Sequence, residues 1–187
     1  DKYTVIASLC LDHSRRKFFD IEPRYPKPCA HALKLFGKIY SNDRNTKDMN
    51  EQQRLYYHQK FSAPYMEELG IWLSEQRKEV EENGPLGAAI RYSLDRWTEL
   101  NEFLHTPGVP LSNAECERTI KLIIMHRKNS LFYKTTKGAH VGDVIQSLIA
   151  TCHKANINCF KYLDWIQRNK SQVMKNPEKF LPWCFSE

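Results

Sequence analysis

The sequence predicts a mainly α-helical fold with one N-terminal strand. Helical periodicity covers most of the chain, and in its clearest instance, residues 86–104, Trp97 shares one face with a row of aliphatic residues. Glycine and proline pairs at 84–85 and 107–108 separate the helical segments. Residues 3–11 are instead an apolar run that favours a strand. No other segment is a convincing partner for it, so we expect the neighbouring strands upstream of residue 1 or in another copy.

The helices expected in the first part of the chain occupy residues 12–22, 29–40, 47–61, 64–83 and 86–104. The first begins at Asp12, a suitable N-cap, and carries the basic residues Arg15, Arg16 and Lys17. Prolines at 23, 26 and 28 end it, and Pro64 opens the fourth. Trp97 is predicted to anchor the core, because it lies on the apolar face of its helix.

A central helix is expected to begin near Asn113, because Ser112 and Glu115 have the spacing of a capping box. Its predicted apolar stripe consists of Cys116, Ile120, Ile123 and Ile124. Glu117 falls on the border of this stripe, whereas Glu115 points away from it. Glu117 and Lys121 are also four residues apart in the order that gives a weak surface ion pair, so that simpler interpretation stays open.

Further helical segments follow the central one. A turn is expected at residues 135–138, then a buried helix from Val141 to Cys152, and Asn158 can cap a last helix. Beyond Lys170 the regular pattern fades, and Trp183 is expected to dock back onto the fold.

Composition points to an intracellular globular protein with a polyanionic partner. The 28 Lys and Arg exceed the 22 Asp and Glu, giving a formal net charge of +6. No apolar run is long enough to cross a membrane and no signal-peptide pattern opens the chain, so we expect a cytoplasmic location. The six cysteines include no CxxC pair and are expected to be reduced and mostly buried.

Separate stretches of the chain share a pattern. Residues 10–20 read CLDHSRRKFFD, residues 85–100 PLGAAIRYSLDRWTEL, residues 111–118 LSNAECER, residues 127–132 RKNSLF and residues 147–163 SLIATCHKANINCFKYL. These stretches resemble, in order, motifs of the IS66 family of bacterial DDE transposases, such as CWAHARRKFF, LDNNxxER and RKNWLF. The chain departs from the family pattern at Leu11, Asp12, Ser112, Ala114 and Ser130, but the Glu117–Arg118 pair is unchanged.

The resemblance implies a ribonuclease H-like fold in which two aspartates from the sheet and one glutamate from a late helix bind two Mg²⁺ ions. Two metals about 3.5–4 Å apart can activate the attacking oxygen and stabilise the leaving oxygen at phosphorus, and Mg²⁺ prefers oxygen ligands. Glu117 would be the third carboxylate. Asp1 lies too close to Cys10 to be the second, so we expect an inactive fragment of an enzyme that cuts and joins DNA strands.

The same resemblance divides the chain into parts. Residues 1–22 would be the last strand and following helix of the ribonuclease H-like core, residues 23–108 an all-helical insertion, residues 109–170 the C-terminal core helices, and residues 171–187 a tail. The insertion would position DNA ends and contact other protomers, which implies a homo-oligomer in the full-length enzyme.

Basic and amide side chains near the motifs are the candidates for DNA contact, because Arg and Lys supply most sequence-independent affinity for phosphates. They are Arg15, Arg16, Arg118, Arg127, Lys128 and Asn129. Cys10 and His13 form a CxxH pair, which is half of a zinc site at best. We instead expect Cys10 to pack within the strand and His13 to donate a hydrogen bond.

Two other interpretations stay open. A non-catalytic helical DNA-binding module would keep the basic face but would not need Glu117 turned inward. A helical oligomerisation domain would place Trp72, Trp97 and Trp183 at interfaces and would not bind DNA in a salt-dependent way.

Overall fold

The computed structural model describes residues 5–129 and 133–186. Within helix α7 it describes the backbone but not the side chains of Leu122, Ile123, His126, Arg127 and Asn129. The chain divides into two compact units, Asp1–Ala114 and Glu115–Glu187. The described residues are mainly helical and include no strand, so the predicted mainly α class is confirmed.

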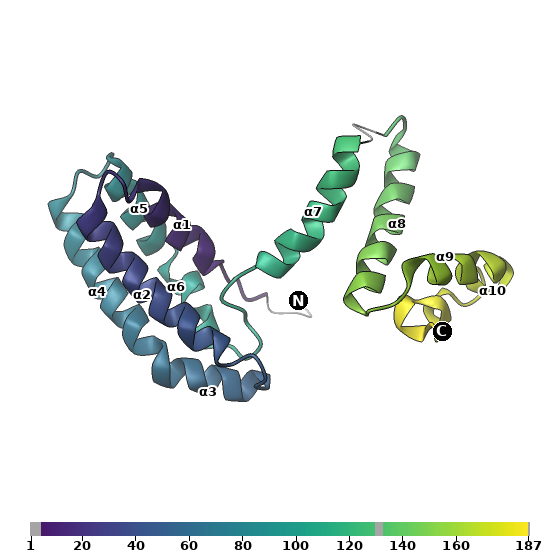
Figure 1. The fold of residues 1–187 in the computed structure, drawn as a ribbon, viewed down its shortest axis with the longest axis horizontal. Coiled ribbons are helices and arrows are strands. Elements are labelled where there is room, and N and C mark those ends of the chain that lie inside the picture. Colours follow the sequence, from purple (N-terminus) through teal and green to yellow (C-terminus); the bar gives the residue numbers. More distant parts are fainter. Residues whose placement is uncertain (1–4, 130–132, 187) are drawn as a thin grey trace. The chain divides into compact units, whose positions relative to one another are not determined.

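The first unit is built on four helices that contact one another in a closed ring (Figure 1). They are α1 (Leu11–Ile21), α2 (Pro26–Arg44), α4 (Ala63–Glu79) and α5 (Pro85–Leu94). Helix α3 (Glu51–Phe61) packs on α2 and α4, and it also contacts the 3₁₀ helix η1 (Glu102–Leu104). The short α6 (Trp97–Leu100) joins α5 to η1.

The core of this unit is apolar and aromatic. Phe18 of α1 is fully buried, and its ring centroid lies 6.1 Å from that of Phe36 and 6.3 Å from that of Trp72. Leu35, Leu69 and Ile90 are buried in the same cluster. Each helix of the ring therefore contributes side chains to one core, which is what the 3.6-residue periodicity of these segments predicts.

Local chemistry explains most helix boundaries. Pro26 and Pro85 stand in the first turns of α2 and α5, where a missing N–H costs nothing. Helix α3 begins at Glu51 rather than near Lys47, because Asn50 and Gln53 form a reciprocal capping box. Gly108 ends the unit's helical part with a φ of 80°, a conformation that favours glycine.

The predicted continuous helix over residues 86–104 is wrong. It breaks at Asp95 and Arg96 into α5, α6 and η1. After the break, the ring of Trp97 packs so closely on α4 that a Cβ at Gly70 would lie 2.7 Å from it. The Asn101 amide then donates to the Trp97 carbonyl oxygen at 2.7 Å. Tertiary packing therefore overrides the local pattern, although Leu100 and Leu104 stay buried as predicted.

The predicted strand at residues 3–11 is also wrong over the described residues 5–10, while Tyr3 and Thr4 lie outside the described residues. Residues 5–10 have no regular secondary structure, and Val5 is 91% exposed. The backbone N–H of Leu9 donates to the Glu99 carbonyl at 3.1 Å, in the helical α6 segment rather than in a neighbouring strand. A strand needs a paired edge, and the described part of the chain offers none.

The second unit contains α7 (Ala114–Asn129), α8 (Thr136–Lys154), α9 (Cys159–Arg168), α10 (Lys170–Val173), η2 (Pro177–Phe180) and η3 (Pro182–Cys184). Thr135 and Asn158 cap α8 and α9 through their side chains, and the Asn158 cap is as predicted. Helix α8 packs against α9 and η3 (Figure 1).

Aromatic side chains hold the C-terminal helices together. The ring centroid of Trp165 lies 4.7 Å from that of Phe180 and 5.3 Å from that of Phe185, and the Tyr162 hydroxyl donates to the Phe180 carbonyl at 2.8 Å. Trp183 is 67% exposed, so the expectation that it docks is wrong. Phe180 and Phe185 take that role because they flank the turn that carries Trp183 outward.

The cysteines and the helices agree in part with the sequence analysis. All six cysteines are free, but only Cys29 and Cys152 are buried, so the expectation of mostly buried thiols is wrong.

Within the described residues, no helix has the length and apolarity to span a membrane.

Candidate functional site

Glu117 lies in the first turn of α7 and is partly buried. Its neighbour Glu115 is exposed and pairs with the Lys154 ammonium at 3.2 Å. The difference in exposure matches the orientation expected from helical geometry. Both carboxylates also lie at the positive end of the helix dipole, which stabilises negative charge.

The apolar stripe predicted for α7 is not covered where its side chains are described. Cys116 is exposed, Ile120 is 52% exposed and Ile124 is 46% exposed, while the Ile123 side chain lies outside the described residues. The stripe is therefore apolar, as predicted, but its described side chains are exposed. Periodicity indicates which face is apolar, but it does not say what covers that face.

The segment that leads into α7 is fixed to the start of α1. The Ser112 hydroxyl accepts a hydrogen bond from the Ala114 N–H at 3.1 Å and donates one to the Asp12 carboxylate. The Leu11 N–H donates to the Leu111 carbonyl at 2.9 Å. Ser112 thus bonds the first N–H of α7, but it lies two residues before Ala114, so it does not take the N-cap position that the capping box predicts.

Two capping predictions fail at the same place. Glu115 does not complete a capping box, because its carboxylate pairs with Lys154 instead. Asp12 is not the N-cap of α1 either. That position belongs to Cys10. Asp12 lies in the first turn of α1, where its carboxylate accepts a hydrogen bond from the Ser112 hydroxyl.

The Asp12–Ser112 contact is expected to stabilise the start of α7. Ser112→Ala should lower the free energy of unfolding by about 0.5–1.5 kcal/mol, the usual net contribution of a hydrogen bond. The exchange Asp12→Ala with Ser112→Asp should recover much of that loss, because a carboxylate at 112 can cap the helix directly. Thermal unfolding of Asp12→Ala, Ser112→Asp and the double variant measures the coupling between the two side chains. Purely additive losses would contradict it.

The predicted DNA-contacting residues lie on two helices in different units. Arg118 and Lys128 are exposed on α7. On α1, Arg16 is exposed, and the Arg15 guanidinium lies 5.8 Å from the centre of the Phe19 ring. The side chains of Arg127 and Asn129 lie outside the described residues. The exposed cations can reach a phosphate.

The described residues do not by themselves fit a catalytic metal pair. No three His, Cys, Asp or Glu side chains among residues 5–129 and 133–186 gather closely enough to hold a metal ion. Glu117 supplies the oxygen donor that Mg²⁺ prefers, but one carboxylate does not hold two ions. The Cys10 thiol, which was expected to pack in a strand, lies 3.8 Å from the Ser112 hydroxyl oxygen as a weak donor.

A buried polar network in the first unit was missed by the sequence analysis. His58 is 1% exposed, and its ring nitrogens lie 3.0 Å from the Ser62 hydroxyl and 3.2 Å from the Asp43 carboxylate. Arg54 donates to the same carboxylate oxygen at 2.7 Å. The order Ser–His–Asp is that of a hydrolase triad, but Ser62 is fully buried, so no substrate can reach it. The network joins α2 to α3.

The one available signal was the four-residue spacing of His58 and Ser62, which places both on one face of the chain as it leaves α3. The partner Asp43 lies in a stretch that reads as a polar break between helices. In the structure α2 continues to Arg44, so that Asp43 faces His58 from a helix.

Acid should weaken this network. Burial alone would raise the pKa of the Asp43 carboxyl, but the hydrogen bond from His58 and the charge of Arg54 outweigh it and lower that pKa below its ordinary value. A lowered folded-state pKa stabilises the protein above the unfolded value of about 3.9. That stabilisation is lost as pH falls through the lower folded value.

Asp43→Asn should therefore have a lower free energy of unfolding than the parent at pH 6. The difference between the two free energies should narrow below about pH 4. Urea unfolding at a series of pH values measures it. Asp164→Asn is the control, because Asp164 forms an exposed pair with Arg168 within one helix. A gap for Asp43→Asn that stays constant from about pH 6 to about pH 2 would contradict the prediction.

Comparison with known proteins defines the class. The family model described as "Transposase IS66 family" matches residues 1–141 of the 187. The class is therefore that of transposases. The chain belongs to the IS66 family, as the motifs around Cys10 and Glu117 indicated.

Three proteins of Sinorhizobium fredii, all described as uncharacterized, are similar to the chain. Protein y4jD is 29% identical over 180 residues, which cover 94% of this chain and 35% of the relative. Protein y4hP is 26% identical over 193 residues, with 96% and 35% covered, and y4qI is 24% identical over 189 residues, with 97% and 34% covered. The chain thus spans about a third of the length of these relatives. No solved structure matches it.

Proposed function

We propose that this chain is a C-terminal part of the catalytic region of a DDE transposase that cuts and joins DNA strands by two-metal phosphoryl transfer. The observation that carries the proposal is the placement of Glu117, partly buried in the first turn of a helix that lies within the family match. Glu115 is the less suitable acid, because it is exposed.

In this proposal Glu117 is one carboxylate ligand of a Mg²⁺ pair, and the two aspartates come from the part of the transposase that this chain does not include. Bound metal would supply the charge stabilisation at phosphorus. The chain itself would be inactive, since one carboxylate cannot hold two ions. Its own contribution is to carry Glu117 in the first turn of α7.

A ribonuclease H-like fold for the complete enzyme is part of the same proposal. Such a fold packs late helices on a sheet. The exposed Ile120 and Ile124 of α7 give that helix the kind of apolar face that a sheet covers. The intact transposase would act in the bacterial cytoplasm, where its DNA substrate is.

Binding to transposon-end and target DNA is the accessible test of the proposal in this chain. Arg127→Ala with Lys128→Ala should weaken binding to duplex DNA and reduce the slope of log Kd against log salt by roughly 0.9 for each phosphate that is no longer neutralised. Filter binding or fluorescence anisotropy at several salt concentrations measures it. Lys34→Ala with Arg77→Ala is the control. Both side chains are exposed, on α2 and α4, and replacing them removes the same two positive charges. Equal effects of the two double variants would contradict the assigned role of α7.

One observation favours oligomerisation as a second activity. Helix α8 exposes Val141, Val144 and Ile145 by 42–49% each, an apolar row of the kind that mediates protein contacts. Trp72 and Trp97, however, pack within the first unit, so they do not support an interface there. Light scattering of the full-length transposase with and without DNA tests whether it forms a homo-oligomer, and a monomer in both states would exclude it.

A further inference from the structure

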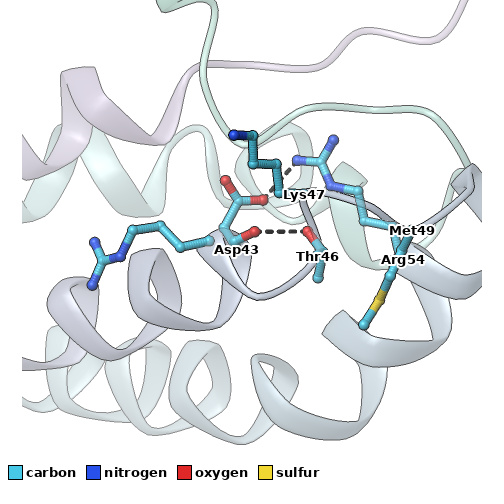
Figure 2. Close-up of a pocket in the computed structure, with 6 residues that line it drawn as sticks. Asp43, Thr46, Lys47, Met49 and Arg54 are labelled. Carbon is cyan, nitrogen blue, oxygen red and sulfur yellow. Dashed lines mark hydrogen bonds and ion pairs between the residues drawn. The ribbon is translucent and has the colours of Figure 1, made fainter.

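The loop between α2 and α3 forms a hollow that the sequence analysis did not single out. It has a volume of about 510 Å³ and is lined by Asp43, Arg44, Thr46, Lys47, Met49 and Arg54 (Figure 2). Cationic side chains therefore reach it from the end of α2, from the loop and from the first turn of α3. It belongs to the first unit, whereas Glu117 belongs to the second.

The balance of charge in the hollow is positive. Three of the six lining residues, Arg44, Lys47 and Arg54, are cations and only Asp43 is an anion. One oxygen of Asp43 already lies 2.7 Å from the Arg54 guanidinium and 3.2 Å from His58. Arg44 and Lys47 are exposed, and neither has a carboxylate within ion-pair distance among the described residues. Their charges are therefore available to a ligand.

The geometry of the hollow is fixed in advance. Asp43 holds the Arg54 guanidinium, whose Nε is buried and has no hydrogen-bond partner among the described residues. The Thr46 hydroxyl donates to the Asp43 carbonyl at 2.7 Å, which fixes the turn that presents Lys47. Figure 2 shows Lys47 and Arg54 extending to the same side of this turn as the Asp43 carboxylate. A ligand here would meet donors that are already in place, which lowers the entropic cost of binding.

We propose that this hollow binds a phosphate group of the DNA backbone and so gives the helical unit its own DNA contact. The inference rests on the proposed function, because the transposase assignment supplies DNA as the polyanion. Guanidinium groups offer forked donors that suit phosphate oxygens, and an ammonium adds a mobile charge. The two exposed cations let a strand pass across the site, whereas a free phosphate ion would need enclosure. Sequence is not read here, since phosphate contacts carry none.

The test measures binding of this chain to a DNA duplex of about 30 base pairs by anisotropy over a series of salt concentrations. The variant Arg44→Ala with Lys47→Ala removes the two available charges and leaves Arg54 and Asp43 in place. Lys34→Ala with Arg77→Ala is the matched control: Arg44 and Arg77 both stand in the last turn of a helix, and each pair loses one Arg and one Lys. Circular dichroism melting checks that both double variants fold like the parent.

The proposal expects the salt slope of Arg44→Ala/Lys47→Ala to fall by roughly 0.9 or more, with at least a severalfold weaker Kd, while the control changes little. Equal changes in both variants would mean that only overall charge matters and would overturn it. A second arm titrates inorganic phosphate and follows the amide NMR signals of Thr46 and Lys47. Shifts there without any effect of the variant on DNA affinity would assign the site to a free anion and overturn the DNA assignment.

Absence of DNA binding by the parent chain would also overturn the proposal. Failure of this proposal and failure of the proposed function stay distinguishable. The proposed function is tested by the dependence of strand cleavage on Glu117 in the full-length transposase, whatever the result at Arg44 and Lys47.

Discussion

Glu117→Gln is expected to abolish strand cleavage by the full-length transposase while leaving its DNA affinity nearly unchanged. The amide keeps the size and the helix position of the side chain but removes the negative charge that a divalent cation requires. A metal contributes several kcal/mol to the transition state, and each 1.4 kcal/mol is about tenfold in rate, so the loss should be about a thousandfold or more. Cleavage of labelled transposon-end DNA with Mg²⁺ measures the rate, and anisotropy measures binding.

Glu115→Gln is the matched control for this experiment. It makes the same chemical change two residues away, on an exposed side chain whose carboxylate pairs with Lys154. Losing such an exposed pair costs at most about 1 kcal/mol, so the control should cleave DNA at close to the parent rate. Parent-like cleavage by Glu117→Gln, or equal losses in both variants, would remove Glu117 from the site.

The helices that the sequence predicted correctly are those whose ends are set by local chemistry. Asn158 caps α9 through its own side chain, and Gly108 adopts a left-handed conformation where the chain leaves the helical part of the first unit. Pro85 marks the start of α5 in the same way, whereas Pro26 and Pro28, which were predicted to end the preceding helix, lie in the first turn of α2. Such signals act over a few residues, so they can be read without knowing the fold.

The failures come from contacts between distant residues. The break at Asp95 follows from packing of Trp97 on Gly70 in another helix, and the failed strand follows from the lack of a paired edge among the described residues. Asp12 was expected to cap its own helix, but it accepts a hydrogen bond from Ser112, 100 residues away. Local pattern cannot anticipate a partner at that separation.

The candidate site residues show the same difference between local patterns and contacts of distant residues. The partly buried Glu117 and the exposed Glu115 could be told apart from helical periodicity, because both lie on one helix. The cations of the α2–α3 hollow could not be found this way, since Arg44, Lys47 and Arg54 line one hollow only when Asp43 joins the two helices. The sequence named residues on single elements and missed those brought together by the fold.

Phe18→Ala is expected to have the largest effect on stability in the first unit. The ring is fully buried and packs against Phe36 and Trp72 from two neighbouring helices, so truncation leaves a cavity between α1, α2 and α4. Phe→Ala changes in cores cost about 3–5 kcal/mol. That is a large part of the free energy of unfolding of a typical domain, which is roughly 5–15 kcal/mol. Urea unfolding followed by the indole NMR signals of Trp72 and Trp97 reports on this unit alone.

Phe19→Ala provides the comparison within the same helix, because Phe19 is 54% exposed and lies under the Arg15 guanidinium. Its loss removes only partly buried surface and one cation–π contact, so it should cost about 1 kcal/mol or less. The sequence treats the two phenylalanines alike, and only the direction of α1 separates them. Similar losses in both variants would mean that α1 does not face the core as the structure has it.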